Sequence, residues 1–139
     1  MKGIADTGFL VAFANRHDDH HLWALGVAEQ VDPPLLTCES VLAETAFHLQ
    51  NSEVVLAMVR DGLVQVAIDV DAELPHLAAL AKRYANRRPD LADLCLIRLS
   101  ELHPTRRVLT VDEADFRVYR RNKREAIPLV VPPAARQSK

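Results

Sequence analysis

Two aspartates each come directly after a short apolar segment that is typical of a β-strand. Asp6 follows residues 1–5, and Asp112 follows residues 107–111. Buried strands of this kind, separated by helical segments, pair in parallel, and active sites in such sheets lie beyond the carboxyl ends of the strands. We therefore expect both carboxylates to face one crevice.

Two further acids lie in segments with helical spacing. Glu44 has apolar neighbours, among which a carboxylate without a partner is costly to bury. Asp93 lies in the first turn of an expected helix, and Asp90, three residues earlier, shares nearly the same helix face. Several carboxylates could therefore converge in the folded chain.

A cluster of carboxylates favours one kind of chemistry. Crowded carboxylates repel one another and raise one another's pKa unless a cation compensates, and a hard divalent ion with oxygen ligands is the usual solution. Mg²⁺ fits best, and Mn²⁺ is the alternative. Such an ion can position a water and neutralise charge on phosphorus oxygens, so hydrolysis of a nucleic-acid backbone is the natural reaction.

Each acid also has a structural interpretation. Asp90 is most simply a helix N-cap, whereas a cap and a ligand explain Asp93 about equally well. Asp6 could cap the helix that follows it, and Asp115 could begin a short helical turn. Glu44 is the hardest to explain structurally, although a neighbouring arginine could satisfy it. The joint arrangement, not any single acid, favours the functional interpretation.

Periodic apolar residues predict the elements that carry these acids. Helices are expected after Asp6, at 20–31, from caps at Ser40 and Ser52, at 72–84 after a cap at Asp71, and after Asp90. Strands are expected at 1–5, 35–37, 64–70, 107–111 and 128–131. Short apolar strands that alternate with helices predict an α/β fold of three layers, α/β/α, around a central, mainly parallel sheet.

The composition predicts one domain. The chain has 139 residues, 49% hydrophobic and 26% charged, which suffices for a single core. No repeat, low-complexity run or Gly/Ser linker divides it. We assign residues 1–133 to the domain and residues 134–139 to a polar C-terminal tail.

Charge is distributed unevenly along the chain. Residues 1–70 contain 3 Lys+Arg and 10 Asp+Glu, whereas residues 71–139 contain 14 and 9, for a net charge of -2. A basic stripe beside an acidic centre would suit an enzyme that acts on a polyanion. On charge alone, a solvated surface of mixed sign is the better interpretation.

Cysteine usage and hydropathy indicate an intracellular protein. Cys38 and Cys95 are too few and too far apart for a disulfide framework or a zinc site, and both are expected in the core. No apolar stretch approaches the roughly 18 to 20 residues that span a bilayer. No signal peptide is recognisable, so we expect a cytoplasmic protein without membrane contact.

The order of these motifs resembles a PIN domain, and specifically the VapC family of bacterial toxin ribonucleases. The first motif is an apolar strand followed by D-[ST]-x-x-L at Asp6–Leu10, and the second is S-x-x-x-E at Ser40–Glu44. The run DLADLCLIRLSE, with Asp93, and the run LTVDEADF, with Asp112 and Asp115, follow in the same order. The resemblance covers almost the entire chain, and the ordered set is strongly specific.

The resemblance implies roles for the acids. Asp6, Glu44 and Asp93 match the most dependable metal-site acids of the family, Asp112 matches the fourth, and Asp115 is a weaker candidate ligand. It further implies Mg²⁺-dependent endoribonuclease activity on RNA, inhibition by a small antitoxin protein, and a homodimer. A non-catalytic PIN-like module that binds a partner, and a DNA-directed nuclease of the same fold, remain alternatives.

Candidate nucleic-acid contacts surround the acids. Thr7 resembles a hydroxyl residue that supports the first acid, whereas Gly8 departs from many relatives, which have Ser or Asn near this position. The basic candidates are Arg87, Arg88, Arg117, Arg120 and Arg121. The run that contains the last three could grip RNA phosphates or an acidic antitoxin tail, and RNA contact and a solvated helix end are about equally favoured.

Other signals are assigned structural or peripheral roles. The triplet Asp6-Thr7-Gly8 also occurs in aspartic proteases, but their fold is nearly all β. His17, His20 and His21 are interpreted as surface residues. The apolar candidates for a dimer or antitoxin surface are Trp23, Leu25 and Phe47. For Phe47, burial in the core is the preferred interpretation.

Overall fold

One parallel sheet forms the centre of the molecule. The structure is a computed structural model that describes residues 1–134, so the expected tail at 134–139 lies, apart from Ala134, outside the described residues. The sheet order is β3-β2-β1-β4-β7, and each pairing is parallel. The strands are β1 (Gly3–Ala5), β2 (Leu35–Thr37), β3 (Val64–Val66), β4 (Arg107–Leu109) and β7 (Leu129–Val130).

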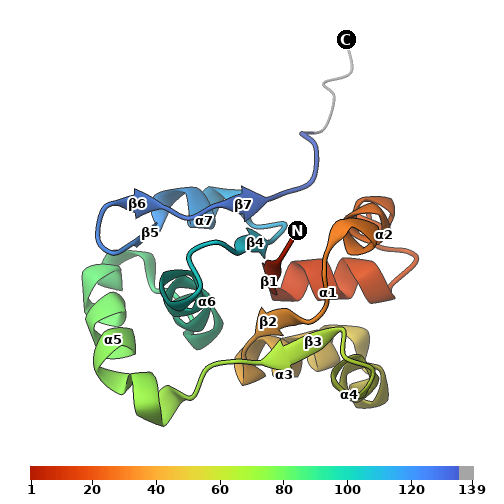
Figure 1. The fold of residues 1–139 in the computed structure, drawn as a ribbon, viewed down its shortest axis with the longest axis horizontal. Coiled ribbons are helices and arrows are strands. Elements are labelled where there is room, and N and C mark those ends of the chain that lie inside the picture. The colour runs from red at the N-terminus through yellow and green to blue at the C-terminus, as the bar shows by residue number, and fades with distance from the viewer. Residues whose placement is uncertain (135–139) are drawn as a thin grey trace.

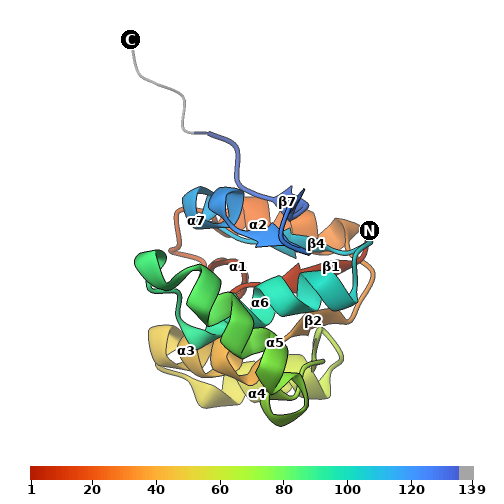
Figure 2. The ribbon, with the colours of Figure 1, turned by 90° about the vertical axis from the view of Figure 1, so that its left-hand side faces the viewer.

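Helices cover both sides of this sheet, with α5 and α6 on one side and α1 and α2 on the other (Figures 1 and 2). The expectation of a three-layer α/β/α fold is confirmed. The helices are α1 (Thr7–Ala14), α2 (His21–Gln30), α3 (Glu39–Leu49), α4 (Ser52–Arg60), α5 (Val70–Arg83), the 3₁₀ turn η1 (Ala85–Arg87), α6 (Leu91–Leu102) and α7 (Glu113–Val118). A small antiparallel hairpin, β5 (Arg120–Arg121) and β6 (Glu125–Ala126), was not predicted.

Helix caps explain where several helices begin. Asp90 caps α6 by accepting a hydrogen bond from Asp93 N at 2.8 Å, so the expected cap is confirmed. Three other expected caps were wrong by one or two residues: the side chains of Asn51 and Asp69 accept the capping hydrogen bonds of α4 and α5, and α3 begins without a side-chain cap. The observed N-cap residues are Cys38 rather than Ser40 for α3, Asn51 rather than Ser52 for α4, and Asp69 rather than Asp71 for α5.

The core extends over both sides of the sheet and includes residues of α1, α2 and α6, and the interior positions of α6 are almost all buried. Cys38 and Cys95 are both buried, as expected. The preferred core position of Phe47 was wrong, since its side chain is 78% exposed on α3. Trp23 packs partly buried against the core, and Leu25 is exposed.

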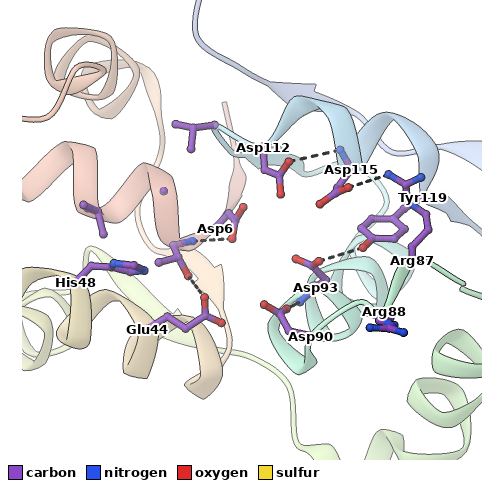
Figure 3. Close-up of a pocket in the computed structure, with 14 residues that line it drawn as sticks. Asp6, Glu44, His48, Arg87, Arg88, Asp90, Asp93, Asp112, Asp115 and Tyr119 are labelled. Atoms are coloured by element: carbon purple, nitrogen blue, oxygen red, sulfur yellow. Dashed lines mark hydrogen bonds and ion pairs between the residues drawn. The ribbon is translucent and has the colours of Figure 1, made fainter. Parts of the chain in front are cut away.

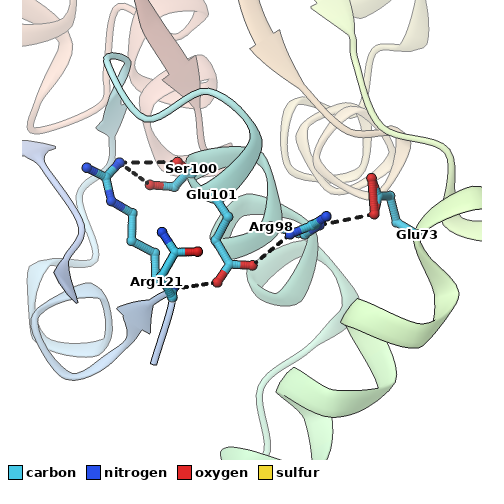
Figure 4. A network of polar contacts seen from close by, with 6 residues as sticks. Glu73, Arg98, Ser100, Glu101 and Arg121 are labelled. Carbon is cyan, nitrogen blue, oxygen red and sulfur yellow. Dashed lines mark hydrogen bonds and ion pairs between the residues drawn. The ribbon is translucent and has the colours of Figure 1, made fainter. Parts of the chain in front are cut away.

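Helix α6 also holds neighbouring elements through charged side chains (Figure 4). Arg98 bridges Glu73 of α5 (3.0 Å) and Glu101 of its own helix (3.2 Å). Arg121 reaches from the hairpin to Ser100 O at 3.1 Å. Arg98 and Ser100 both lie on α6, so this helix holds α5 and the hairpin in place relative to the sheet.

The strand order places a crevice at one edge of the sheet. The chain adds β2 and β3 on one side of β1 and then β4 and β7 on the other, so the order reverses between β1 and β4. The connections that leave two such strands separate from each other, which opens a crevice beyond their carboxyl ends. Asp6 follows β1 and Asp112 lies three residues beyond β4, so both are at this crevice.

Candidate active site

A polar cleft of about 500 Å³ occupies this crevice (Figure 3). It contains the four acids singled out from the sequence, which reach it from β1, α3, α6 and the loop after β4. The lining residues are Asp6, Thr7, Gly8, Val11, Glu44, His48, Arg87, Arg88, Asp90, Asp93, Val111, Asp112, Asp115 and Tyr119. The fold therefore brings together acids that are up to 106 residues apart in the sequence.

Asp6 is the most buried of the acids, with 8% of its surface exposed. Thr7 N donates to Oδ1 at 2.7 Å, and Thr110 Oγ1 donates to Oδ2 at 2.6 Å. The Thr110 hydroxyl also accepts a hydrogen bond from Asp112 N at 2.9 Å, so it links the aspartates that follow β1 and β4. Burial, together with the charges of Asp112 and Glu44, raises the pKa of Asp6 to about 6 despite these donors.

Glu44 enters the cleft from the middle of α3 and is half-buried. Thr7 Oγ1 donates to its Oε2 at 3.3 Å, so a hydroxyl rather than the anticipated arginine is its partner. Burial and the charge of Asp90 raise the pKa of Glu44, whereas Thr7 and His48 act in the opposite direction.

Asp93 lies in the first turn of α6, on the opposite wall of the cleft (Figure 3). The hydroxyl of Tyr119 donates to Oδ2 at 3.0 Å. Burial, then the charge of Asp90, raises the pKa of Asp93 to about 7, with smaller contributions from Asp6 and Asp112. Asp90 thus both caps α6 and adds negative charge to the cleft.

Asp112 and Asp115 form the third wall. Asp112 caps α7 by accepting from Asp115 N at 3.5 Å, and burial and the charge of Asp115 raise its pKa. Arg87 Nη2 donates to Asp115 Oδ1 at 2.8 Å. Asp115 therefore already has the Arg87 guanidinium as its partner at the rim of the cleft.

The donor set fits a hard divalent cation. Burial is the main cause of the raised pKa of Asp6 and of Asp93, and the charges of neighbouring carboxylates add to it, so a cation in this cleft would be favoured. Within residues 1–134, no group of three or more His, Cys, Asp and Glu side chains is arranged so that it could hold a metal ion without some movement of the side chains. Mg²⁺ commonly keeps several waters and takes only one or two carboxylates, so an open set of oxygen ligands suits it.

The basic candidates fall into two groups. Arg87 and Arg88 line the cleft and are exposed, so both can meet a phosphate at its rim. Arg117 pairs with Glu113 on the exposed face of α7, and Arg120 Nη1 donates to backbone oxygens of its own segment, so neither lines the cleft.

The expectation for Arg121 requires a correction. Its side chain is buried, with 5% exposed, and Nη1 donates to Ser100 O (3.1 Å) and Pro104 O (2.9 Å). Nη2 pairs with Glu125 at 2.6 Å. Arg121 fastens the hairpin to α6, so it cannot contact nucleic acid from this position.

Two cleft residues were missed from the sequence. His48 follows Glu44 by four residues on α3, and this spacing on one helix face was a usable signal. Tyr119 comes from the segment after α7, 26 residues beyond its partner Asp93. No local spacing pattern could pair these two residues.

Comparison with known families identifies the fold. The family model described as PIN domain matches residues 4–122, a segment that includes all four acids and Tyr119. This chain belongs to the PIN domain family. A search of curated proteins finds no significant match.

The PIN domain is a nuclease-type fold, and PIN domain nucleases generally use divalent metals. The matched segment contains β4, α6 and all of β1 except Gly3, and these elements place Asp112, Asp93 and Asp6. Strand β7, which pairs with β4, lies beyond it. None of the helices in the described part of the chain has both the length and the apolar character needed to cross a bilayer.

Proposed function

We propose that this PIN domain is a metal-dependent endoribonuclease of the VapC type, which hydrolyses RNA phosphodiester bonds with Mg²⁺ or Mn²⁺. The observation that carries the proposal is the convergence of Asp6, Glu44, Asp93 and Asp112 on one cleft, where their charges oppose one another. Such an arrangement is costly to the fold unless a cation compensates it, so it is more easily explained by function than by stability.

Each residue has a defined task in this proposal. Asp6 and Asp112, linked by the Thr110 hydroxyl, provide carboxylate oxygens from the sheet edge, and Glu44 and Asp93 provide them from the two sides. When bound, the divalent cation would activate a water and neutralise charge on the scissile phosphate. Arg87 and Arg88 at the rim would hold the phosphates of the substrate backbone.

The decisive experiment compares the wild-type chain with Asp6→Asn. Asparagine keeps the shape of the side chain and an acceptor oxygen for Thr7 N, so the protein should fold, but the charge that binds a cation is lost. We expect cleavage of RNA with Mn²⁺ to fall by at least about 100-fold, as for other groups that stabilise transition-state charge. Asp71→Asn is the matched control, since Asp71 is exposed on α5 and does not line this cleft.

The same assay separates the alternatives. RNA and DNA of one sequence are incubated with each variant, and Mn²⁺ binding is measured by calorimetry. Cleavage of RNA by the wild type and by Asp71→Asn, but not by Asp6→Asn, supports the proposal. Cleavage of DNA alone would support the DNA-directed nuclease, Mn²⁺ binding without cleavage of either would support the non-catalytic module, and full activity of Asp6→Asn would refute the assignment.

We further propose a toxin role with a cognate antitoxin, and a homodimer, because exposed apolar side chains on three helices leave surface for a partner to cover. These side chains are Leu22 (82% exposed), Phe47 (78%) and Leu56 (66%). Light scattering on the isolated chain should give twice the monomer mass, and a monomer would contradict the dimer.

Induced expression of the wild-type chain should arrest growth, and expression of Asp6→Asn should not. Unaffected growth with the wild type would contradict the toxin role.

A further inference from the structure

The Asp93 carboxylate has a partner that the acidic motifs do not contain. The Tyr119 hydroxyl donates a hydrogen bond to Asp93 Oδ2 at 3.0 Å. In Figure 3 the other carboxylate oxygen points into the space shared with Asp6 and Asp112. One oxygen of Asp93 is thus held from behind while the other faces the cleft.

The ring of Tyr119 is fixed by its surroundings. Its residue is 1% exposed, and its ring makes edge contacts with Phe116 (5.5 Å between centroids) and Tyr84 (5.1 Å). The Tyr84 hydroxyl accepts from Arg120 N at 2.8 Å and donates to Arg120 O at 3.3 Å. The Tyr84 hydroxyl thus bonds to the residue after Tyr119, whereas the packing of the Tyr119 ring against Phe116 and the Tyr84 ring gives the Tyr119 hydroxyl its position.

The position of this hydroxyl is set relative to the helix that carries Asp93. After Tyr119 the chain enters the hairpin, where Arg121 Nη1 donates to Ser100 O at 3.1 Å and Asn122 N donates to Glu101 Oε2 at 2.6 Å. Ser100 and Glu101 lie at the far end of α6 from Asp93. Asp93 is part of α6, and the segment that carries Tyr119 is attached to the same helix. The Tyr119 hydroxyl is therefore held close to Asp93.

The other buried acids of the cleft have the same kind of support. Thr110 Oγ1 donates to Asp6, and Thr7 Oγ1 donates to Glu44. A hydroxyl that holds one carboxylate oxygen leaves the second oxygen directed at a ligand, and such outer partners commonly set the orientation and the affinity of metal-binding groups. Tyr119 fills this place for Asp93.

We propose that Tyr119 is a positioning residue, whose hydrogen bond orients the Asp93 carboxylate toward a divalent cation in the cleft. The inference rests on the proposed function, because it concerns the same cation. Tyr119 itself contacts neither the cation nor the substrate in this proposal. Its hydroxyl acts only through Asp93.

Two matched variants test this inference. Tyr119→Phe removes the hydroxyl from Asp93, and Tyr84→Phe removes the neighbouring hydroxyl, whose hydrogen bonds within residues 1–134 are to the Arg120 backbone. Each variant keeps its aromatic ring, so a structural role would lower the melting temperature in both and leave Mn²⁺ affinity unchanged in both. We expect calorimetry without RNA to show Mn²⁺ binding about 10- to 100-fold weaker in Tyr119→Phe and unchanged in Tyr84→Phe.

A spectroscopic measurement gives a second readout. Tyr84 and Tyr119 are the two tyrosines of the chain, so in Tyr84→Phe the tyrosine absorption comes from Tyr119 alone. Mn²⁺ bound to Asp93 draws charge from the oxygen that accepts this hydrogen bond, so adding the ion should produce a tyrosine difference spectrum. The absence of such a spectrum in Tyr84→Phe would overturn the inference, even if Tyr119→Phe does not fold.

Asp93→Asn separates the failure of this inference from the failure of the proposed function. Loss of Mn²⁺ binding in Asp93→Asn with wild-type affinity in Tyr119→Phe would overturn the positioning role alone. Unchanged affinity in Asp93→Asn would show that Asp93 holds no cation, and the proposed function would fail at that residue. Weakened binding in both variants, with Tyr84→Phe unchanged, is the expected result.

Discussion

Asp6 and Asp93 are carboxyl groups whose surroundings oppose their charge. Burial is the main cause for both, and neighbouring carboxylates add to it, so the pKa values reach about 6 and about 7. Both values lie above the ordinary aspartate value of 3.8. Below about pH 4 the folded and unfolded states both carry these protons. Between about pH 4 and pH 7 the folded state retains protons that the unfolded state has lost.

The metal-free protein should therefore lose stability as pH rises through this window, because stability falls with pH wherever the folded state binds more protons. For Asp6 alone the loss is roughly 3 kcal/mol, from about 1.4 kcal/mol per pKa unit. Urea denaturation in EDTA between pH 5 and pH 8 measures the part of this loss that falls above pH 5, which is about 1.4 kcal/mol for one pKa unit. Asp6→Asn should show a shallower decline than the wild type. Identical declines in the two proteins would contradict the prediction.

The functional position of a single residue could be predicted from the sequence when burial of its side chain without a partner would cost much free energy. Glu44 among apolar neighbours is such a case, and the fold places it in the cleft. Arg121 shows the limit, because a basic run does not reveal which member is buried, and its partners lie on α6 and the hairpin. Tyr119 shows the same limit, since its partner lies 26 residues away.

The connections that follow β1 and β4 touch at Gly8 and Val111. A Cβ atom at Gly8 would lie 2.2 Å from Val111 Cγ2, so glycine is required there by the neighbouring connection rather than by its backbone angles. This contact leaves no room for the Cβ of a larger residue at position 8 unless the Val111 side chain moves. It also keeps Asp6 and Asp112 adjacent, since each lies one or two residues from the contact.

Gly8→Ala should consequently destabilise the protein by about 1 to 3 kcal/mol, the usual effect of overpacking. The loss should be largely recovered in Gly8→Ala with Val111→Ala, because the next Val111 atom is 3.4 Å away. Gly26→Ala on α2 is the control, since a Cβ there meets nothing within 4 Å and alanine favours a helix by about 0.5 to 1 kcal/mol. Urea denaturation measures all three. Full stability of Gly8→Ala alone would contradict the assigned contact.

Elements were predictable in type and order, but less so at their ends. The alternation of short apolar strands and helices gave the correct class, because a buried parallel sheet requires apolar strands and covering helices. The strand expected at 64–70 ends at Val66, since capping by Asp69 starts α5 at Val70. The β5–β6 hairpin has two residues in each strand, too few for a periodic pattern to reveal it.

At the scale of the whole molecule, a cation that binds only the folded chain must stabilise it. The stabilisation grows with the concentration of the ion relative to its dissociation constant and reaches about 2.7 kcal/mol at 100 times that constant. We expect Mn²⁺ to raise the melting temperature of the wild type and EDTA to reverse the effect. Asp6→Asn should show a smaller rise, and an equal rise would place the cation outside the cleft.

The order of strands in the sheet has a consequence for synthesis of the chain. Thr110, whose hydroxyl holds Asp6, has its backbone N–H bound to Val130 O at 3.1 Å in β7. This strand is made after the segment that contains all four acids. During synthesis the nascent chain therefore contains all four acids before it contains the strand that binds Thr110, so the support of Asp6 is the last part of the cleft to be completed.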